Sequence, residues 1–163
     1  MRALPEFSLT AVTVDGTSPF DKRALRGRPW IANFVFTRCA GPCPMLTANM
    51  ASLQKTLPSR VGLLSFTVDP DNDGPEALTQ YARKFGADPR RWFFLTGEKS
   101  ELVRVVRDGF LLPVVEDPTA AVGERFAHSA KFALVDPEGR VRGWWDGDDD
   151  KALAALAEAA AGL

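Results

Sequence analysis

Cysteine and histidine are scarce in this chain of 163 residues, which holds two cysteines and one histidine. Two cysteines cannot form the framework of bridges that stabilises small secreted scaffolds. A chain of this length does not need one, because it can bury most of its apolar surface without covalent help. The two stand four positions apart, so a bridge between them would close a short loop and add little stability. Chemistry therefore explains their proximity better than stapling does.

Excess charge and long apolar runs are missing as well. The net charge is −1, which gives no support for a nucleic-acid or anionic-membrane surface. No apolar run approaches the roughly 18 residues that span a bilayer, and the opening MRALPEFSLT lacks the apolar centre of a signal peptide. We expect a chain that is soluble as given, and the sequence is compatible with a removed export signal or a native membrane anchor.

Repeats and low-complexity linkers are absent, and 45% hydrophobic with 25% charged residues is the composition of a globular protein. We predict a single domain over residues 1–163. Apolar runs at 30–36, 61–69 and 91–97 are typical of buried strands, and helices are predicted over 44–57, 75–86, 98–110 and 146–163. Residues 132–145 indicate a hairpin around a Pro-Glu-Gly turn, and another hairpin is expected near 7–14.

The order of these elements is typical of a thioredoxin-like α/β fold. Strands and helices alternate three times, and an antiparallel hairpin and a last helix follow. We therefore predict a central mixed sheet flanked by helices, with an N-terminal hairpin and an insertion at 111–127 before the C-terminal hairpin. The length of this insertion favours a mobile loop. A fold of this kind does not by itself fix a function.

Both cysteines lie in FVFTRCAGPCPM, between the first central strand and the next helix. Pro42 disfavours helical geometry at Gly41, which makes Cys43 the expected N-cap residue. The positive end of the helix dipole, with Arg38 beside Cys39, then favours thiolates. Three residues separate the cysteines, one more than in the thioredoxin-type redox motif, yet such a pair can still form a disulfide. A redox pair, part of a metal site and two buried apolar side chains are the alternatives.

The only histidine, His128, precedes the predicted strand that begins near residue 132. In thioredoxin-like folds the loop entering that strand approaches the cysteine loop, so Cys39, Cys43 and His128 are expected to converge. Two soft sulfurs and one imidazole suit Cu(I), and with added ligands they also hold Cu(II). Zinc accepts the same donors together with water, but ligand softness slightly favours copper. A histidine making one hydrogen bond in the core or on the surface is the alternative.

Three segments resemble the SCO/SenC family of copper proteins. FVFTRCAGPCPM, FTVDPDNDGPEAL and HSAKFALVDPEGRV are similar to the family's F-x-F-T-x-C-x-x-x-C-P, V-D-P-x-x-D-x-P-E-x-L and H-S-x-x-x-x-L-V-D-P-x-G segments, in the same order. The resemblance implies a thioredoxin-like fold in which Cys39, Cys43 and His128 bind one copper ion. It also implies that Asp69 shapes the copper surroundings or supports thiol proton transfer. Ala-Gly-Pro between the cysteines and Gly74 in the second segment depart from the family pattern.

The same resemblance implies a function and a location. The favoured function is a copper-binding metallochaperone that assists copper delivery to the binuclear copper site of cytochrome c oxidase. Its partner would be a copper-accepting protein such as a cytochrome c oxidase subunit, at the bacterial periplasm or the outer face of the inner membrane. The alternative is a thiol-disulfide oxidoreductase in which Cys39 and Cys43 reduce a partner's cysteines. A peroxide-reducing thiol enzyme is a third hypothesis.

For several other residues, a structural role is the simplest interpretation. Asp69 and Asp73 flank a turn before a helix, where capping and turn formation are the simplest roles. Trp144 and Trp145 are adjacent on a predicted strand and must point to opposite faces, which leaves one of them for docking a partner. Met45 is expected to pack in the core rather than to supply a thioether ligand.

Overall fold

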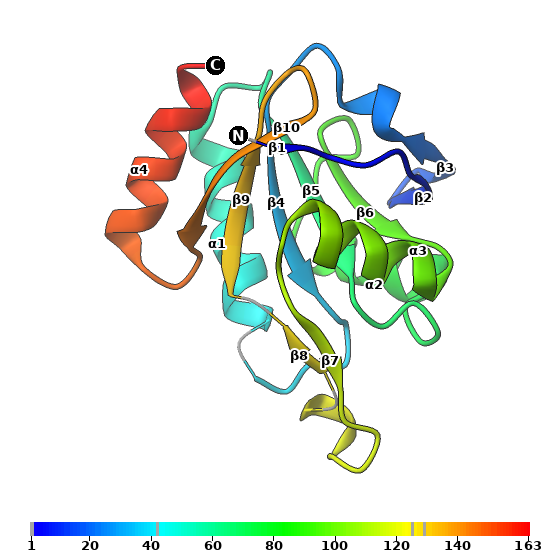
Figure 1. Ribbon diagram of the computed structural model, residues 1–163. Helices are drawn as coiled ribbons and strands as arrows, with labels where there is room; N and C mark the ends of the chain where they lie inside the picture. Colours follow the sequence, from blue (N-terminus) through cyan, green and yellow to red (C-terminus); the bar gives the residue numbers. More distant parts are fainter. Residues whose placement is uncertain (1, 42, 125, 129) are drawn as a thin grey trace.

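An eight-stranded mixed sheet forms the centre of the molecule, in the order β1-β10-β9-β4-β5-β6-β2-β3 (Figure 1). The computed structural model describes residues 2–41, 43–124, 126–128 and 130–163, with only the backbone of 124 and 126–128. The strands of the sheet are β1 (Arg2–Ala3), β2 (Ser8–Thr13), β3 (Gly16–Asp21), β4 (Trp30–Val35), β5 (Gly62–Thr67), β6 (Trp92–Thr96), β9 (Lys131–Val135) and β10 (Arg140–Asp146).

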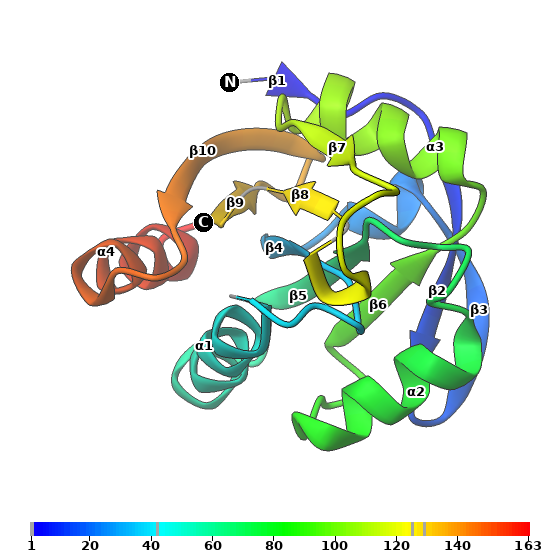
Figure 2. The same ribbon diagram turned by 90° about the horizontal axis from the view of Figure 1, so that it is seen from below.

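Helices cover both faces of this sheet (Figure 2). On one face lie α1 (Cys43–Thr56) and α2 (Pro75–Lys84), and α4 (Asp150–Ala161) packs beside α1. The other face is covered by α3 (Lys99–Arg104), which continues directly into a π-helical turn, Val105–Gly109. None of the helices in the described ranges is long and apolar enough to cross a membrane.

The core holds the carboxyl end of β4 in a fixed place. Strands β4, β5 and β6 are parallel neighbours, and β4 and β5 are buried at every position because helices cover both faces. On the α3 side, Phe34 and Phe66 stack with ring centroids 5.6 Å apart, and Phe110 meets them edge-on at 5.1 and 5.3 Å. The loop that carries the cysteines therefore leaves from a rigid strand.

This architecture confirms the predicted thioredoxin-like layout of a mixed sheet flanked by helices. The first hairpin is longer than predicted, because it contains β2 and a second strand, β3, that continues to Asp21. Strand β3 lies at the edge of the sheet, is mostly exposed and contains Pro19, so it lacks the apolar alternation that marks a strand. The last helix begins later than predicted, since Asp149 caps α4 by accepting a hydrogen bond from the Ala152 N–H.

The segment 111–127, predicted to be a loop, contains regular structure. Strand β7 (Val114–Glu116) pairs antiparallel with β8 (Phe126–His128), and a 3-10 turn, Val122–Glu124, lies between them. Val114 stands opposite His128 in this register. Figures 1 and 2 place this β7–β8 hairpin (114–128) at the end of the sheet where β4 ends. Strands of three residues are too short to show a period of two, which explains why the pattern was not visible.

Candidate functional site

Cys39 lies within the connection between β4 and α1, the cysteine loop (36–42), and Cys43 comes directly after this loop in the sequence. Cys39 follows the turn after β4, where its N–H donates to the Phe36 carbonyl at 3.1 Å. Cys43 is the first residue of α1, which corrects its predicted position as N-cap by one residue, a shift that sequence patterns do not resolve. No disulfide joins the two thiols, and their side chains share a hydrogen bond. The two predicted sulfur donors are therefore adjacent.

Burial makes the two thiols unequal. Cys43 is fully buried and Cys39 is partly exposed. Burial raises the pKa of the Cys43 thiol, and the hydrogen bond with Cys39 raises it further. The expectation that the helix dipole makes Cys43 a ready thiolate is therefore wrong, because desolvation outweighs a helix-end interaction of at most about 2 kcal/mol. Arg38, predicted to act beside Cys39, instead has its guanidinium 3.7 Å from the carboxylate of Asp69.

Asp73 holds the start of the cysteine loop to the neighbouring strands. Its buried carboxylate accepts hydrogen bonds from the N–H of Thr37 at 3.0 Å and from the hydroxyls of Thr37 and Thr67. The hydroxyl of Thr96 donates to the Asp73 carbonyl at 3.0 Å. Asp73 thus has a larger role than the predicted turn and cap, because it joins the ends of β4, β5 and β6. In the sequence, the one indication of this role was that a threonine ends or closely follows each of these three strands.

The carboxyl of Asp73 should make stability depend on pH. Burial raises its pKa, although the hydrogen bonds from Thr37 and Thr67 lower it. A folded-state pKa above the ordinary 3.8 means that stability is fully present below pH 3.8 and is lost as pH rises through the folded-state value. We expect Asp73→Asn to flatten this decline in the free energy of unfolding, as measured by urea denaturation at stepped pH. Asp71→Asn, at an exposed neighbour, is the control, and an unchanged pH slope in Asp73→Asn would contradict the expectation.

Asp69 connects the cysteine loop to the loop between β5 and α2. It is 4% exposed, and the side-chain N–H groups of Asn72 donate to both of its carboxylate oxygens at 3.0 Å. Its carbonyl accepts the N–H of Asp73 at 2.9 Å, so the predicted turn is present. The ion pair with Arg38 links this turn to the residue before Cys39. A role of Asp69 toward copper or a thiol proton stays a prediction.

The β7–β8 hairpin contacts the cysteine loop directly. The N–H of Ala40 donates to the Gly123 carbonyl at 2.9 Å. The approach is so close that a Cβ on Gly123 would lie 2.4 Å from the Cβ of Ala40, so only glycine fits there. Strand β8 ends at His128, but the side chain of His128 lies outside the described residues, and its convergence with the thiols stays a prediction. Within the described residues, no three His, Cys, Asp or Glu side chains are grouped to hold a metal ion.

The predicted burial is wrong for Met45 and is confirmed for the tryptophan pair. Met45 is 48% exposed, which makes its predicted core packing wrong. Positions 43 and 45 lie about 200° apart around a helix axis, so the burial of Cys43 turns Met45 outward. Trp144 is 39% exposed and Trp145 packs against the core, as strand alternation predicted. The indole N–H of Trp144 donates to the Phe110 carbonyl at 2.9 Å, and its docking role stays a prediction.

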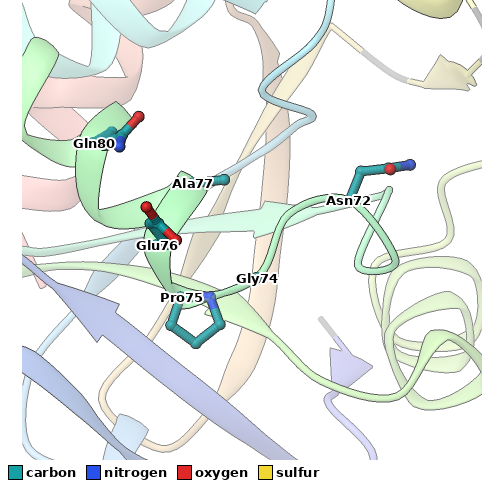
Figure 3. A pocket seen from close by; sticks show the side chains of 6 residues that line it. All are labelled: Asn72, Gly74, Pro75, Glu76, Ala77 and Gln80. Atoms are coloured by element: carbon teal, nitrogen blue, oxygen red, sulfur yellow. The ribbon is translucent and has the colours of Figure 1, made fainter.

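Two shallow cavities lie along α2 beside the cysteine loop. The first, of about 390 Å³, is lined by residues of α2 and of the loop before it, Asn72, Gly74, Pro75, Glu76, Ala77 and Gln80 (Figure 3). The second, of about 300 Å³, shares Ala77 and Gln80 with the first and reaches Thr37. Neither cysteine lines either cavity. Chemistry at the partly exposed Cys39 would therefore take place outside these two cavities.

Comparison with known sequences finds one family over nearly the whole chain. Residues 3–161 match the SCO1/SenC family. The SCO1 protein homolog of Bacillus subtilis (strain 168) is 37% identical over 122 residues, which are 72% of this chain and 62% of that protein. A Stutzerimonas stutzeri protein named for copper binding is 32% identical over 146 residues, 87% of this chain and 68% of the relative. The chain thus spans less than two thirds of the Bacillus relative.

Solved structures with the same fold include two with more than 30% identity. A SCO1/SenC family lipoprotein from Bacillus anthracis str. Ames shares 33% identity at a TM-score of 0.86, over 99% of this chain and 95% of that one. The structure of BsSco shares 31% identity at a TM-score of 0.79, over 99% and 95% of the two chains. BsSco is a member of the Sco family of cytochrome c oxidase assembly proteins, and a disulfide switch was identified in it. Both likenesses extend over the entire fold.

Proposed function

The chain belongs to the SCO1/SenC family, and from this we propose that it is a copper-binding metallochaperone for the binuclear copper site of cytochrome c oxidase. The observation that carries the proposal is the adjacency of the Cys39 and Cys43 thiols beside the hairpin that ends at His128. The Stutzerimonas relative named for copper binding supports the cargo. The membership of BsSco in a family of cytochrome c oxidase assembly proteins supports the partner.

The donor set fits copper as cargo. Thiolates are soft ligands that select Cu(I), and an imidazole extends the set toward Cu(II). The site also has room beside Cys39, because a Cβ on Gly41 would stand 4.0 Å from the Cys39 sulfur and meet nothing nearer. Cys39, Cys43 and His128 would together hold one ion. Zinc accepts the same donors and is the less favoured cargo.

Unequal burial of the thiols gives copper release an order. A partner can reach the partly exposed Cys39 first, whereas Cys43 is enclosed in the first turn of α1. An incoming thiolate of the partner would therefore bind the ion as Cys39 leaves, and would replace Cys43 afterwards. Each exchange substitutes one thiolate for another, so the ion moves without changing its oxidation state.

A cytochrome c oxidase subunit is the proposed acceptor, and this places the protein on the side of the membrane where that copper site is assembled. The proposed location is the bacterial periplasm or the outer face of the inner membrane. The Bacillus anthracis relative is a lipoprotein, which supports a location at a membrane surface outside the cytoplasm. An anchor for this chain is part of the same proposal.

Titration of the fully reduced protein with Cu(I) and with Cu(II) tests the function. We expect one copper ion per chain for each oxidation state, measured as the copper-to-protein ratio after gel filtration. The matched control is the same protein with Cys39 and Cys43 oxidised to a disulfide, which should retain no copper because its thiolates are consumed. A ratio near zero for the reduced protein would remove the metallochaperone function.

A thiol-disulfide oxidoreductase is the second candidate, because a partly exposed Cys39 beside a buried Cys43 matches the roles of attacking and resolving thiol. The Cys39 thiolate would attack a partner's disulfide and release one partner thiolate, which takes up a proton. Cys43 would lose its proton and displace the second partner thiolate, leaving a Cys39–Cys43 disulfide. Two electrons pass to the partner in this sequence, and no step uses His128.

A further inference from the structure

Charged side chains from four segments form an alternating series beside the site. Arg38 of the cysteine loop lies 3.7 Å from Asp69, measured from Nη2 to Oδ2. Lys99, the first residue of α3, has its Nζ 2.6 Å from Oε1 of Glu116 in β7. The hydrogen bond to Glu116 raises the pKa of Lys99, and the negative charges of Glu116, Asp71 and Asp69 raise it further. Lys99 therefore interacts electrostatically with both β7 and the loop between β5 and α2. The series alternates in sign as Arg38, Asp69, Lys99, Glu116.

The two ends of this series belong to the two segments that carry the proposed ligands. Arg38 is the neighbour of Cys39, whereas Glu116 lies in β7 and stands opposite Phe126 of the strand that ends at His128. Among the ion pairs of the described residues, Lys99–Glu116 is the one that joins the β7–β8 hairpin to the rest of the fold. The hydrogen bond from Ala40 to Gly123 holds the hairpin at a second point, near its tip.

We propose that Lys99 and Glu116 are positioning residues that hold the β7–β8 hairpin against the cysteine loop, so that opening of the hairpin sets the rate at which copper loses its histidine ligand. This inference rests on the proposed function for the part that concerns copper. The part that concerns the hairpin stands on the 2.6 Å ion pair and the strand register alone.

The size of the effect follows from the exposure of the pair. Both side chains are partly exposed, and such pairs shift an equilibrium by up to about fivefold. A shift of this size would be hard to detect in the free energy of unfolding of the whole domain. Two strands of three residues are only marginally stable by themselves, so the same shift has a visible effect on local opening of the hairpin. Salt should speed opening in the wild type, because it screens exposed charges.

Hydrogen exchange of the reduced, copper-free protein tests the hairpin directly. The variants are Lys99→Met and Glu116→Gln, which keep side-chain length and remove one charge each, and the double variant. We expect backbone amides of β7 and β8 to exchange about threefold faster in each single variant. The double variant should be no faster than either, because the two changes break one interaction. Asp21→Asn is the matched control, since it breaks a 2.8 Å ion pair with Arg23 at the end of edge strand β3.

Copper release supplies the second measurement. With Cu(II) bound and a chelator in excess, both single variants should release the ion about threefold faster, and Asp21→Asn should match the wild type. Faster exchange together with faster release supports the inference. Unchanged hairpin exchange in both single variants overturns it, and so does faster exchange with unchanged release. If the wild type binds no copper, the proposed function fails separately, and exchange of the copper-free hairpin still decides whether Lys99 and Glu116 hold it.

Discussion

Cys43→Ser should strongly weaken the binding of copper to the chain. A hydroxyl is a hard and mostly protonated group, whereas a thiolate is the soft ligand that selects Cu(I). Losing even an outer partner of a metal ligand costs about 10- to 100-fold in affinity, so replacing a ligand should cost more than about a hundredfold. Competition with a Cu(I) chelator of known affinity measures the loss.

The fold should survive this substitution, which keeps the result interpretable. Serine is close to cysteine in size, and its oxygen can accept the hydrogen bond that the Phe36 N–H makes with Cys43. Met45→Leu is the matched control, because it removes the other sulfur of the same helical turn, and that sulfur belongs to an exposed side chain. The control should bind one copper ion. Copper retained by Cys43→Ser at wild-type affinity would show that the buried thiol is not a ligand.

His128→Ala should weaken Cu(II) binding by at least about tenfold more than Cu(I) binding, a difference of about 1.4 kcal/mol. Cu(I) is satisfied by the two thiolates, whereas Cu(II) needs further donors such as an imidazole. Parallel titrations with the two oxidation states measure the difference. The control is Val115→Ala, which trims an exposed residue of the same hairpin and should leave both affinities unchanged. Equal losses for both ions in His128→Ala would contradict a ligand role specific to Cu(II).

The same variant separates the two candidate functions. Thiol-disulfide exchange between Cys39, Cys43 and a partner has no step for an imidazole, so a pure oxidoreductase should keep its rate in His128→Ala. A metallochaperone should lose Cu(II) binding and keep its thiol chemistry. Reduction of a partner's disulfide by the variant at the wild-type rate, with copper affinity unchanged, would therefore favour the second candidate.

Most of the fold that could be predicted was predicted from continuous apolar runs and from proline and glycine at the ends of helices. Strands β4 and β5 are buried at every position, and their sequences are apolar almost throughout, so the prediction followed from composition. Helix α2 begins at Pro75 as predicted, and the chain turns at Gly86, whose φ is 66°. Strands β3, β7 and β8 were missed because they are short or mostly polar, and their pairing depends on residues distant in sequence.

The position of the candidate site could be predicted from the sequence, but the burial and hydrogen bonding of its residues could not. The strand-to-helix loop and the spacing of Cys39 and Cys43 were visible in the sequence, and the structure brings the two thiols together. The helix dipole was visible too, but the burial that raises the pKa of Cys43 depends on the surrounding core and has no local signature. Sequence patterns indicate only a turn or cap at Asp73, because its bonds with Thr37, Thr67 and Thr96 require the ends of three strands to meet.

The contact at Gly123 fixes one end of the segment that leads to His128, so the number of residues between the two positions matters. The backbone of Gly123 is held against Ala40, and four residues separate Gly123 from His128. Side chains alternate between the two faces of a strand, so adding or removing one residue within β8 before His128 would send the histidine to the opposite face. The turn at 117–121 lies before the anchored glycine and carries no such restriction. Natural relatives should therefore tolerate insertions there, and keep the spacing from glycine to histidine while the residues between them vary.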